Sequence, residues 1–198
     1  APRNALREAN ASGFRAAAKL NAMSAALRRL LAAVLTTTLG LASAGCSADP
    51  TAQEWAADVC TALDPWMAEI DTLTADAGAA MDAETPQPDA QQELLNLLSG
   101  AAQASETARA KVAEAGTPDI ADGDVIAQRF ADSLEATRDA YRGAHDELEA
   151  LDASKDDFYD DVQQVMDDLA VEYAQIPQVA ELTSEELQDA FAATPECQ

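Results

Sequence analysis

The sequence has little positive charge, a single histidine and few aromatic side chains. Its 198 residues include 12 Lys and Arg against 36 Asp and Glu, which gives a formal charge of −24, and only 5% of them are aromatic. The phosphate groups of DNA and RNA repel such a polyanion, so the composition argues against nucleic-acid binding. One His also excludes any metal centre or catalytic site that is built from several imidazoles.

Sequence motifs of the common enzyme classes are missing as well. The chain contains no G-x-S-x-G, Walker A, G-x-G-x-x-G or C-x-x-C-H pattern. A Ser-His-Asp mechanism would have His145 as its only base, and a helical pattern provides no strand-end loop on which to build an oxyanion hole. The sequence therefore predicts a protein without enzymatic activity and without a cofactor.

Positive charge is concentrated at the amino terminus. Residues 1–45 hold six of the 12 basic residues and a single acid, Glu8. Residues 46–198 consequently carry six basic and 35 acidic side chains, a formal charge of −29. The charge asymmetry separates a basic amino-terminal segment from an acidic remainder.

The basic segment contains the three parts of a secretory signal peptide. The stretch MSAALRR from Met23 comes first, followed by the apolar run from Leu30 to Leu41 and then by the small residues that precede Cys46. The apolar run has 12 residues, whereas a helix that spans a bilayer needs roughly 20. An uncleaved transmembrane anchor remains an alternative if Ala42 to Gly45 extend that run.

These patterns divide the chain into four segments. Because Met23 is a plausible start of translation, residues 1–22 are interpreted as an upstream extension or as an unusually long basic region. Residues 23–45 are then the signal peptide, residues 46–50 a short membrane-proximal linker, and residues 51–198 the helical domain.

The segment Ser43-Ala44-Gly45-Cys46 resembles the lipobox of bacterial lipoprotein precursors, such as the small helical lipoproteins of actinobacteria. In that family the cysteine thiol is diacylglycerated and the preceding bond is cut, so that the lipidated cysteine becomes the new amino terminus. Ser43 departs from the Leu that is usual at its position. The resemblance implies a lipid anchor on Cys46 and a location at the extracytoplasmic face of the cell membrane. The alternative is an ordinary signal peptide, cut after Ala44, that releases a soluble protein.

The number of cysteines fits this interpretation. If Cys46 is acylated, the other two of the three cysteines, Cys60 and Cys197, form an even pair in an oxidising compartment. A disulfide between them closes a very long loop, for which the chain-entropy model gives at most about 5 kcal/mol of stabilisation. The alternative is a pair of free, buried thiols. Neither cysteine has a neighbouring His or a C-x-x-C spacing, so a disulfide is expected and a redox role is not.

Apolar residues of the acidic domain recur in steps of three and four, which is the helical period. No alternation typical of a strand is found. Each long helix is amphipathic and cannot bury its apolar stripe alone. We therefore expect an all-α fold, an antiparallel four-helix bundle with a short fifth C-terminal helix. The expected helices are Thr51 to Met81 with a kink at Pro65, Asp89 to Val112, Asp122 or Asp124 to Leu151, Phe158 to Ile176, and a last helix that holds Leu187 and Phe191.

Capping residues mark three of the expected helix starts. Asp89 can cap the second helix. Ser154 with Asp157 resembles a capping box for the fourth helix, and Thr183 with Glu186 has the spacing of a capping box for the last one.

His145 is the centre of a weak metal motif. The segment from Gly143 to Glu149 is similar to the G-x-H-x-x-E motif of imelysin-like proteins, which are exported, helical and linked to iron handling, but Leu148 stands at the position of the motif's Glu. Glu149 lies four residues after His145, on the same helical face, and can share a metal with it. Two ligands make a weak site because bound metals usually have three or four. His145 and Glu149 are weak metal candidates, and a surface histidine is the alternative.

These observations together predict a lipid-anchored, extracytoplasmic helical protein of the cell envelope that acts in binding or as a scaffold. Its expected contacts are the membrane, through Cys46, and an unidentified protein or cationic partner for the acidic domain. The alternative is a cation- or metal-binding accessory protein of an uptake system, similar in kind to the imelysin-like proteins.

Overall fold

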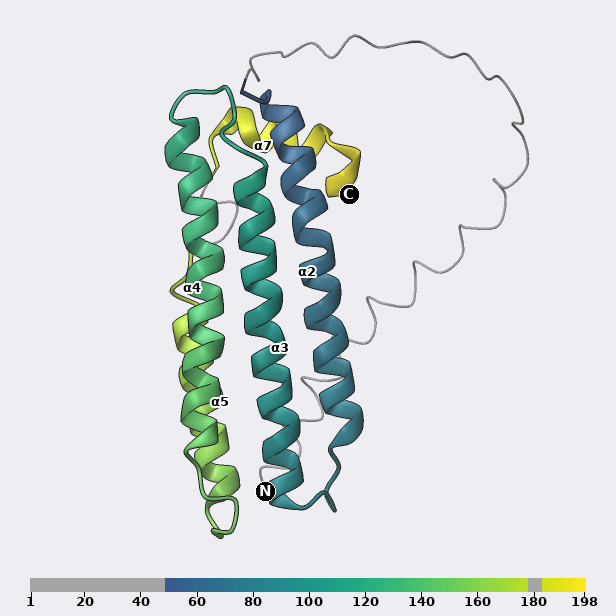
Figure 1. Ribbon diagram of the computed structural model, residues 1–198, viewed down its shortest axis with the longest axis vertical. Coiled ribbons are helices and arrows are strands. Elements are labelled where there is room, and N and C mark those ends of the chain that lie inside the picture. Colours follow the sequence, from purple (N-terminus) through teal and green to yellow (C-terminus); the bar gives the residue numbers. More distant parts are fainter. Residues whose placement is uncertain (1–48, 178–182) are drawn as a thin grey trace, which may run out of the picture. The chain divides into compact units, whose positions relative to one another are not determined.

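A computed structural model describes residues 49–177 and 183–198 of the chain (Figure 1). The predicted lipidation site, Cys46, and the predicted signal peptide lie outside the described residues. Every regular element in the described ranges is a helix, and none of these helices is long and apolar enough to cross a membrane. The elements are α2 (Ala52–Ala80), α3 (Gln87–Glu114), α4 (Gly123–Glu149), α5 (Phe158–Tyr173), α7 (Glu185–Ala193) and the 3₁₀ helix η2 (Pro195–Cys197).

The four longest of these helices run alternately in opposite directions along the bundle (Figure 1). Helix α3 packs most extensively against α4 and then against α2, while α5 packs on α4. Helix α7 and the 3₁₀ helix η2 lie against α2, at the end of the bundle where α2 begins. The predicted antiparallel four-helix bundle with a short fifth C-terminal helix is therefore confirmed.

Buried side chains form two clusters along the bundle. The first cluster draws residues from α2, α3, α4 and α7, and the second from α3, α4 and α5. Helix α5 has 16 residues and covers roughly 24 Å of the bundle at 1.5 Å per residue, so α7 completes the first cluster. The first cluster is Trp55, Val59, Ala62, Ala108, Val112, Ile126, Phe130, Leu134 and Leu187, and the second is Leu98, Ala140, Ala144, Leu148, Phe158, Val162, Val165, Leu169 and Ile176.

Three aromatic rings form the centre of the first cluster. Trp55 is fully buried, and its ring centroid lies 5.1 Å from that of Phe130 and 6.2 Å from that of Phe191. Both contacts are edge-to-face, a geometry that aromatic pairs favour. Trp55 also donates a hydrogen bond of 2.9 Å from Nε1 to the carbonyl of Gly116. Gly116 has a φ of 75°, the left-handed conformation in which helices such as α3 commonly end.

Helix α2 continues through Pro65 as one element, but its second half is less buried than its apolar stripe predicts. Ile70 and Leu73 are half-buried and Met67 is half exposed, while the second cluster contains no residue of α2. Leu73 lies against α3 at Gly100, where the two helices approach closely because Gly100 has no Cβ. A Cβ at that position would lie 2.8 Å from the methyl groups of Leu73.

The predicted N-cap of α3, Asp89, lies three residues after the observed one, Pro86. The helix begins at Gln87 with Pro86 in the capping position, so that Pro88 and Asp89 lie in its first turn. Proline is tolerated there because the first backbone N–H groups of a helix have no partner within the helix. Asp89 therefore adds favourable negative charge to the first turn instead of capping the helix.

The two predicted capping boxes were wrong in detail. The backbone N–H and the hydroxyl of Ser154 both donate to the Asp152 carboxylate, and α5 begins only after Asp157, whose side chain makes no capping bond. Ser184 caps α7 in place of Thr183, its next neighbour, and accepts a hydrogen bond of 3.3 Å from the backbone N–H of Leu187. Short polar side chains that neighbour one another compete for the same donors, which sequence spacing does not resolve.

Candidate functional site

The only histidine of the chain lies near the carboxyl end of α4. His145 is half-buried, with 27% of its side chain exposed, and its Nδ1 lies 3.3 Å from Oδ1 of Asp146. Ala144, directly before His145, and Leu148, two residues after Asp146, are buried in the second cluster. The helix that carries the imidazole is therefore held firmly against its neighbours.

Glu149 completes a cluster of three potential metal ligands with His145 and Asp146. One ligand atom from each residue lies within 4.8 Å of the other two. The structure thus brings together the two predicted candidates, His145 and Glu149, and adds a third. Asp146 was missed because adjacent residues of a helix do not normally face each other. The available signal was that Asp146 directly follows His145 in the sequence.

The motif that resembles the imelysin-like one is not reproduced in space. Leu148, which stands at the position of the motif's Glu, is fully buried in the second cluster. Its direction into the core follows from the helical period, because Ala144 lies one turn earlier on the same buried face. Any ligand set here must therefore use the exposed face of α4, where Asp146 and Glu149 lie.

A groove between α3 and α4 lies beside this cluster. Its volume is about 490 Å³, and both His145 and Asp146 line it. Arg142, one turn before His145, also lines the groove, with 58% of its side chain exposed and its guanidinium 4.0 Å from Asp139. The other lining residues are Ser99, Ala102, Gln103 and Glu106.

An ion-pair network along the same groove ties α3 to α4. Glu106 of α3 contacts Arg109 at 2.6 Å and Arg138 of α4 at 2.7 Å. Hydrogen bonds from Arg109 and then from Arg138 lower the pKa of the Glu106 carboxyl to about 2. Arg138 also pairs with Glu135 and Asp139, so acidic partners on both helices neutralise its charge.

A second groove, of about 370 Å³, lies between α2 and α3. Trp66, which belongs to the apolar stripe of α2, is half-buried in its wall and donates a hydrogen bond of 3.1 Å to the Ser105 hydroxyl. Ser105 is fully buried and donates in turn to the carbonyl of Ala101 at 2.8 Å, so its hydroxyl is satisfied. The other lining residues are Ala62, Pro65, Glu69, Gly100, Gln103, Ala104, Thr107, Ala108 and Lys111.

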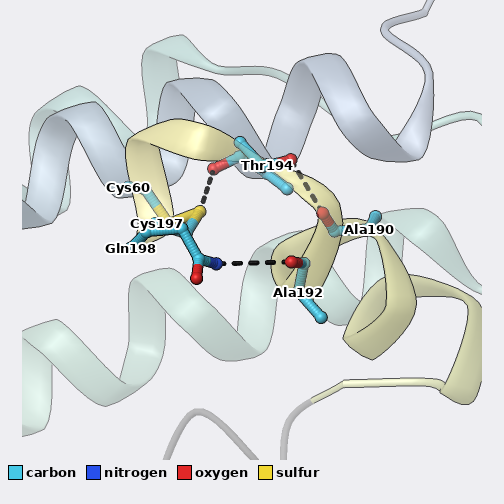
Figure 2. Close-up of a disulfide and its surroundings, with 7 residues drawn as sticks. Cys60, Ala190, Ala192, Thr194, Cys197 and Gln198 are labelled. Carbon is cyan, nitrogen blue, oxygen red and sulfur yellow. Dashed lines mark hydrogen bonds between the residues drawn. A yellow bond between two sulfur atoms is a disulfide. The ribbon is translucent and has the colours of Figure 1, made fainter.

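The remaining predicted site residues are the two cysteines of the acidic domain, and the structure brings them together. Cys60 of α2 and Cys197 of η2 are joined by a disulfide with their Cα atoms 5.2 Å apart, across 137 residues (Figure 2). The chain around Cys197 is ordered by hydrogen bonds from Thr194 to Ala190 and from Gln198 to Ala192. The predicted pairing is confirmed.

No protein-family model, curated protein or solved structure matches this chain. We therefore infer the function of the chain from the chemistry of its own residues. Two features carry that chemistry in the described part of the chain: the disulfide at one end of the bundle, and the cluster around His145 on the exposed face of α4.

Proposed function

We propose that this chain is an exported, lipid-anchored binding or scaffold protein without catalytic activity. It is held at the extracytoplasmic face of the cell membrane through Cys46, and its acidic helical domain binds a basic protein or another cationic partner. The observation that carries the proposal is the disulfide between Cys60 and Cys197.

A structural disulfide supports export, because disulfides form and persist in oxidising compartments and are rare in the cytosol. It also accounts for two of the three cysteines of the chain. Cys46 is thus left without a partner inside the chain, directly after a stretch with the pattern of a signal peptide. Acylation is the role of this cysteine that agrees with both facts.

The anchor sets the distance between the domain and the membrane. Five residues separate Cys46 from Ala52, where α2 begins. An extended chain spans at most about 3.6 Å per residue, so the start of α2 lies within roughly 20 Å of the lipid headgroups. The domain is then a short-tethered module whose partner must also be at the membrane surface.

The charge of the domain supports a cationic partner. Helix α5 carries Asp160 and Asp161 in its first turn and Asp167 and Asp168 one to two turns later, and three of these four side chains are exposed. A surface of one sign raises the association rate of an oppositely charged partner, and this effect weakens as salt is added.

The anchor is tested by replacing Cys46 in the full chain expressed in a bacterial host that processes lipoproteins. We expect the wild type and a Ser47→Ala control to remain in the membrane fraction and to incorporate labelled fatty acid. Cys46→Ala should appear in the soluble exported fraction without label. A Cys46→Ala protein that stays in the membrane with residues 23–45 attached would show an uncleaved anchor and contradict the proposal.

The binding role is tested by chemical crosslinking on intact membranes at low and high salt. The proposal predicts a crosslinked partner that is basic, whose yield falls as salt rises, and which is lost when Asp160 and Asp161 are replaced by Asn. A control with two acids of α2 replaced, Glu69→Gln and Asp71→Asn, has the same net charge. An equal loss in both variants would show attraction without a defined binding surface and would contradict the scaffold role.

A second function, metal binding as an accessory protein of an uptake system, is favoured by the cluster of His145, Asp146 and Glu149. Three potential ligand atoms within 4.8 Å of one another meet the minimum for a protein metal site. Titration with Zn²⁺ of the wild type and of variants of these three residues tests this second function.

A further inference from the structure

We propose that His145, Asp146 and Glu149 bind one divalent transition-metal ion of the Zn²⁺ type on the exposed face at the carboxyl end of α4. The inference deepens the second proposed function by naming the ligands and the class of metal. It does not depend on the lipid anchor, because all three residues belong to α4.

The donor set selects the class of metal. One imidazole nitrogen and two carboxylate oxygens suit Zn²⁺ and its first-row neighbours, for which imidazole is a preferred ligand. Three protein ligands leave a position for water, as in open zinc sites. Ca²⁺ takes six to eight oxygen ligands, so a site with three donors and one of them nitrogen binds it poorly.

The geometry needs only small side-chain rotations to close around an ion. Ligand atoms at a metal–ligand distance of roughly 2.0–2.1 Å lie about 3.4 Å apart in a tetrahedron. His145 and Asp146 are at 3.3 Å, and the full set lies within 4.8 Å. Asp146 and Glu149 are exposed, so rotation of either carboxylate meets little obstruction.

The end of the helix adds to the attraction for a cation. Glu149 is the last residue of α4, and the last turn of this helix carries no basic residue. The carboxyl end of a helix has a partial negative charge that stabilises cations within the last turn. Among nearby residues, Arg142 opposes this field, because it lies one turn before His145 and lines the same groove.

The framework under the site is rigid, which lowers the entropy lost on binding. Ala144 and Leu148 anchor this part of α4 in the second cluster, and the imidazole itself is nearly three-quarters covered. Only the two carboxylates are free to reorient. The groove between α3 and α4 begins beside His145 and Asp146, so an open coordination position there is accessible to water or to an oxygen ligand from solvent.

The single histidine makes the test direct. In the full chain, with its disulfide intact and in a mild detergent, the carbon-bound ring protons of His145 are the only histidine signals in the proton spectrum. Titration with Zn²⁺ at mildly alkaline pH should shift both signals and saturate at one ion per chain, as measured independently by calorimetry. Signals that stay unmoved while metal binds would place the ion elsewhere and overturn the proposal.

Matched variants distinguish a defined metal site from general attraction of the cation to an acidic surface. We expect His145→Gln, Asp146→Asn and Glu149→Gln each to weaken Zn²⁺ binding by roughly 10-fold or more, since even loss of an outer-shell partner has an effect of that size. Glu147→Gln removes the same charge from the same turn of α4 but lies outside the cluster, and it should leave binding nearly unchanged. Equal losses in Glu147→Gln and Glu149→Gln would overturn the proposal.

Three further measurements test the charge of the bound ion, the selectivity of the site and its independence from the lipid anchor. Arg142→Gln should tighten Zn²⁺ binding, and weaker binding in that variant would contradict a cation at this position. Excess Ca²⁺ should not displace Zn²⁺, whereas complete displacement would show an unselective acidic surface. Cys46→Ala should bind Zn²⁺ as the wild type does, so a failed anchor leaves the metal site intact and a failed metal site leaves the anchor intact.

Discussion

Trp55, in the first turn of α2, donates a hydrogen bond of 2.9 Å to the carbonyl of Gly116, in the turn that ends α3. The two residues are 61 positions apart in the chain. The bond therefore joins the start of one helix to the end of the next, at the centre of the first buried cluster.

Replacing Trp55 should be among the most destabilising single changes in this domain. Trp55→Phe keeps an aromatic ring but leaves the Gly116 carbonyl without its donor, which costs about 1–3 kcal/mol. Trp55→Ala also leaves a cavity beside Phe130 and should cost about 3–5 kcal/mol. Urea unfolding followed by circular dichroism measures both. A Trp55→Phe protein as stable as the wild type would show that the hydrogen bond contributes nothing.

The disulfide should stabilise the domain mainly by restricting the unfolded chain. Cys60→Ser with Cys197→Ser removes a link across 137 residues, and a loss of roughly 2–5 kcal/mol is expected. Reducing agent should lower the midpoint of the wild type to that of the double variant and leave the variant unchanged. A wild type that is insensitive to reductant would show that the link does not form in solution.

Protonation of Glu106 should lower the free energy of unfolding in acid. Its folded-state pKa of about 2 lies below the ordinary 4.5, so the unfolded chain takes up a proton first. The contribution of Glu106 to stability is thus complete above pH 4.5 and is lost as the pH falls towards 2. Because the carboxylate is accessible to solvent, the effect is modest and weakens with salt.

The pH effect is measured as the difference between the wild type and Glu106→Gln in urea unfolding at a series of pH values. The difference should be largest near neutral pH and should shrink towards zero in acid. Glu135→Gln is a suitable control, because Glu135 also contacts Arg138 but only at 3.1 Å. A difference that stays constant with pH would contradict the assignment.

Two glycines in the helices should respond differently to alanine. A Cβ at Gly78 would meet no other atom within 4 Å, so Gly78→Ala should stabilise α2 by about 0.5–1 kcal/mol through helix propensity. At Gly100 the added methyl meets Leu73 at 2.8 Å, and Leu73 must rotate away. Gly100→Ala should therefore gain less than Gly78→Ala, or lose stability. Thermal unfolding of the two variants tests the order.

The existence and order of the helices could be predicted because apolar residues such as Phe130 and Leu134 repeat at the helical period. Helix starts could not, because neighbouring polar residues such as Thr183 and Ser184 are equally able to cap. The half-exposure of Ile70 depends on which helices cover α2, and α5 packs on α4 instead, which is a property of the tertiary fold.

The candidate metal site could be predicted in part from the sequence. His145 and Glu149 share a helical face, and the period alone places them together. Asp146 joins them through the rotation of its side chain, and its position directly after His145 was the one signal for it in the sequence. The pairing of Cys60 with Cys197 could be predicted only by counting cysteines, since the two are 137 positions apart and nothing between them indicates that the two ends of the domain meet.

The participation of α7 in the first cluster has a consequence for the order of folding. Trp55 is near the beginning of the domain, whereas Leu187, which packs in the same cluster, is near its end. A chain that is still emerging from a ribosome or a translocation channel cannot complete this cluster until its last residues are released. The second cluster needs only residues 98–176 and can form earlier. Removal of the last dozen residues would delete Leu187 and expose the first cluster to solvent. Quality-control proteases would then cleave the chain at that end of the bundle first.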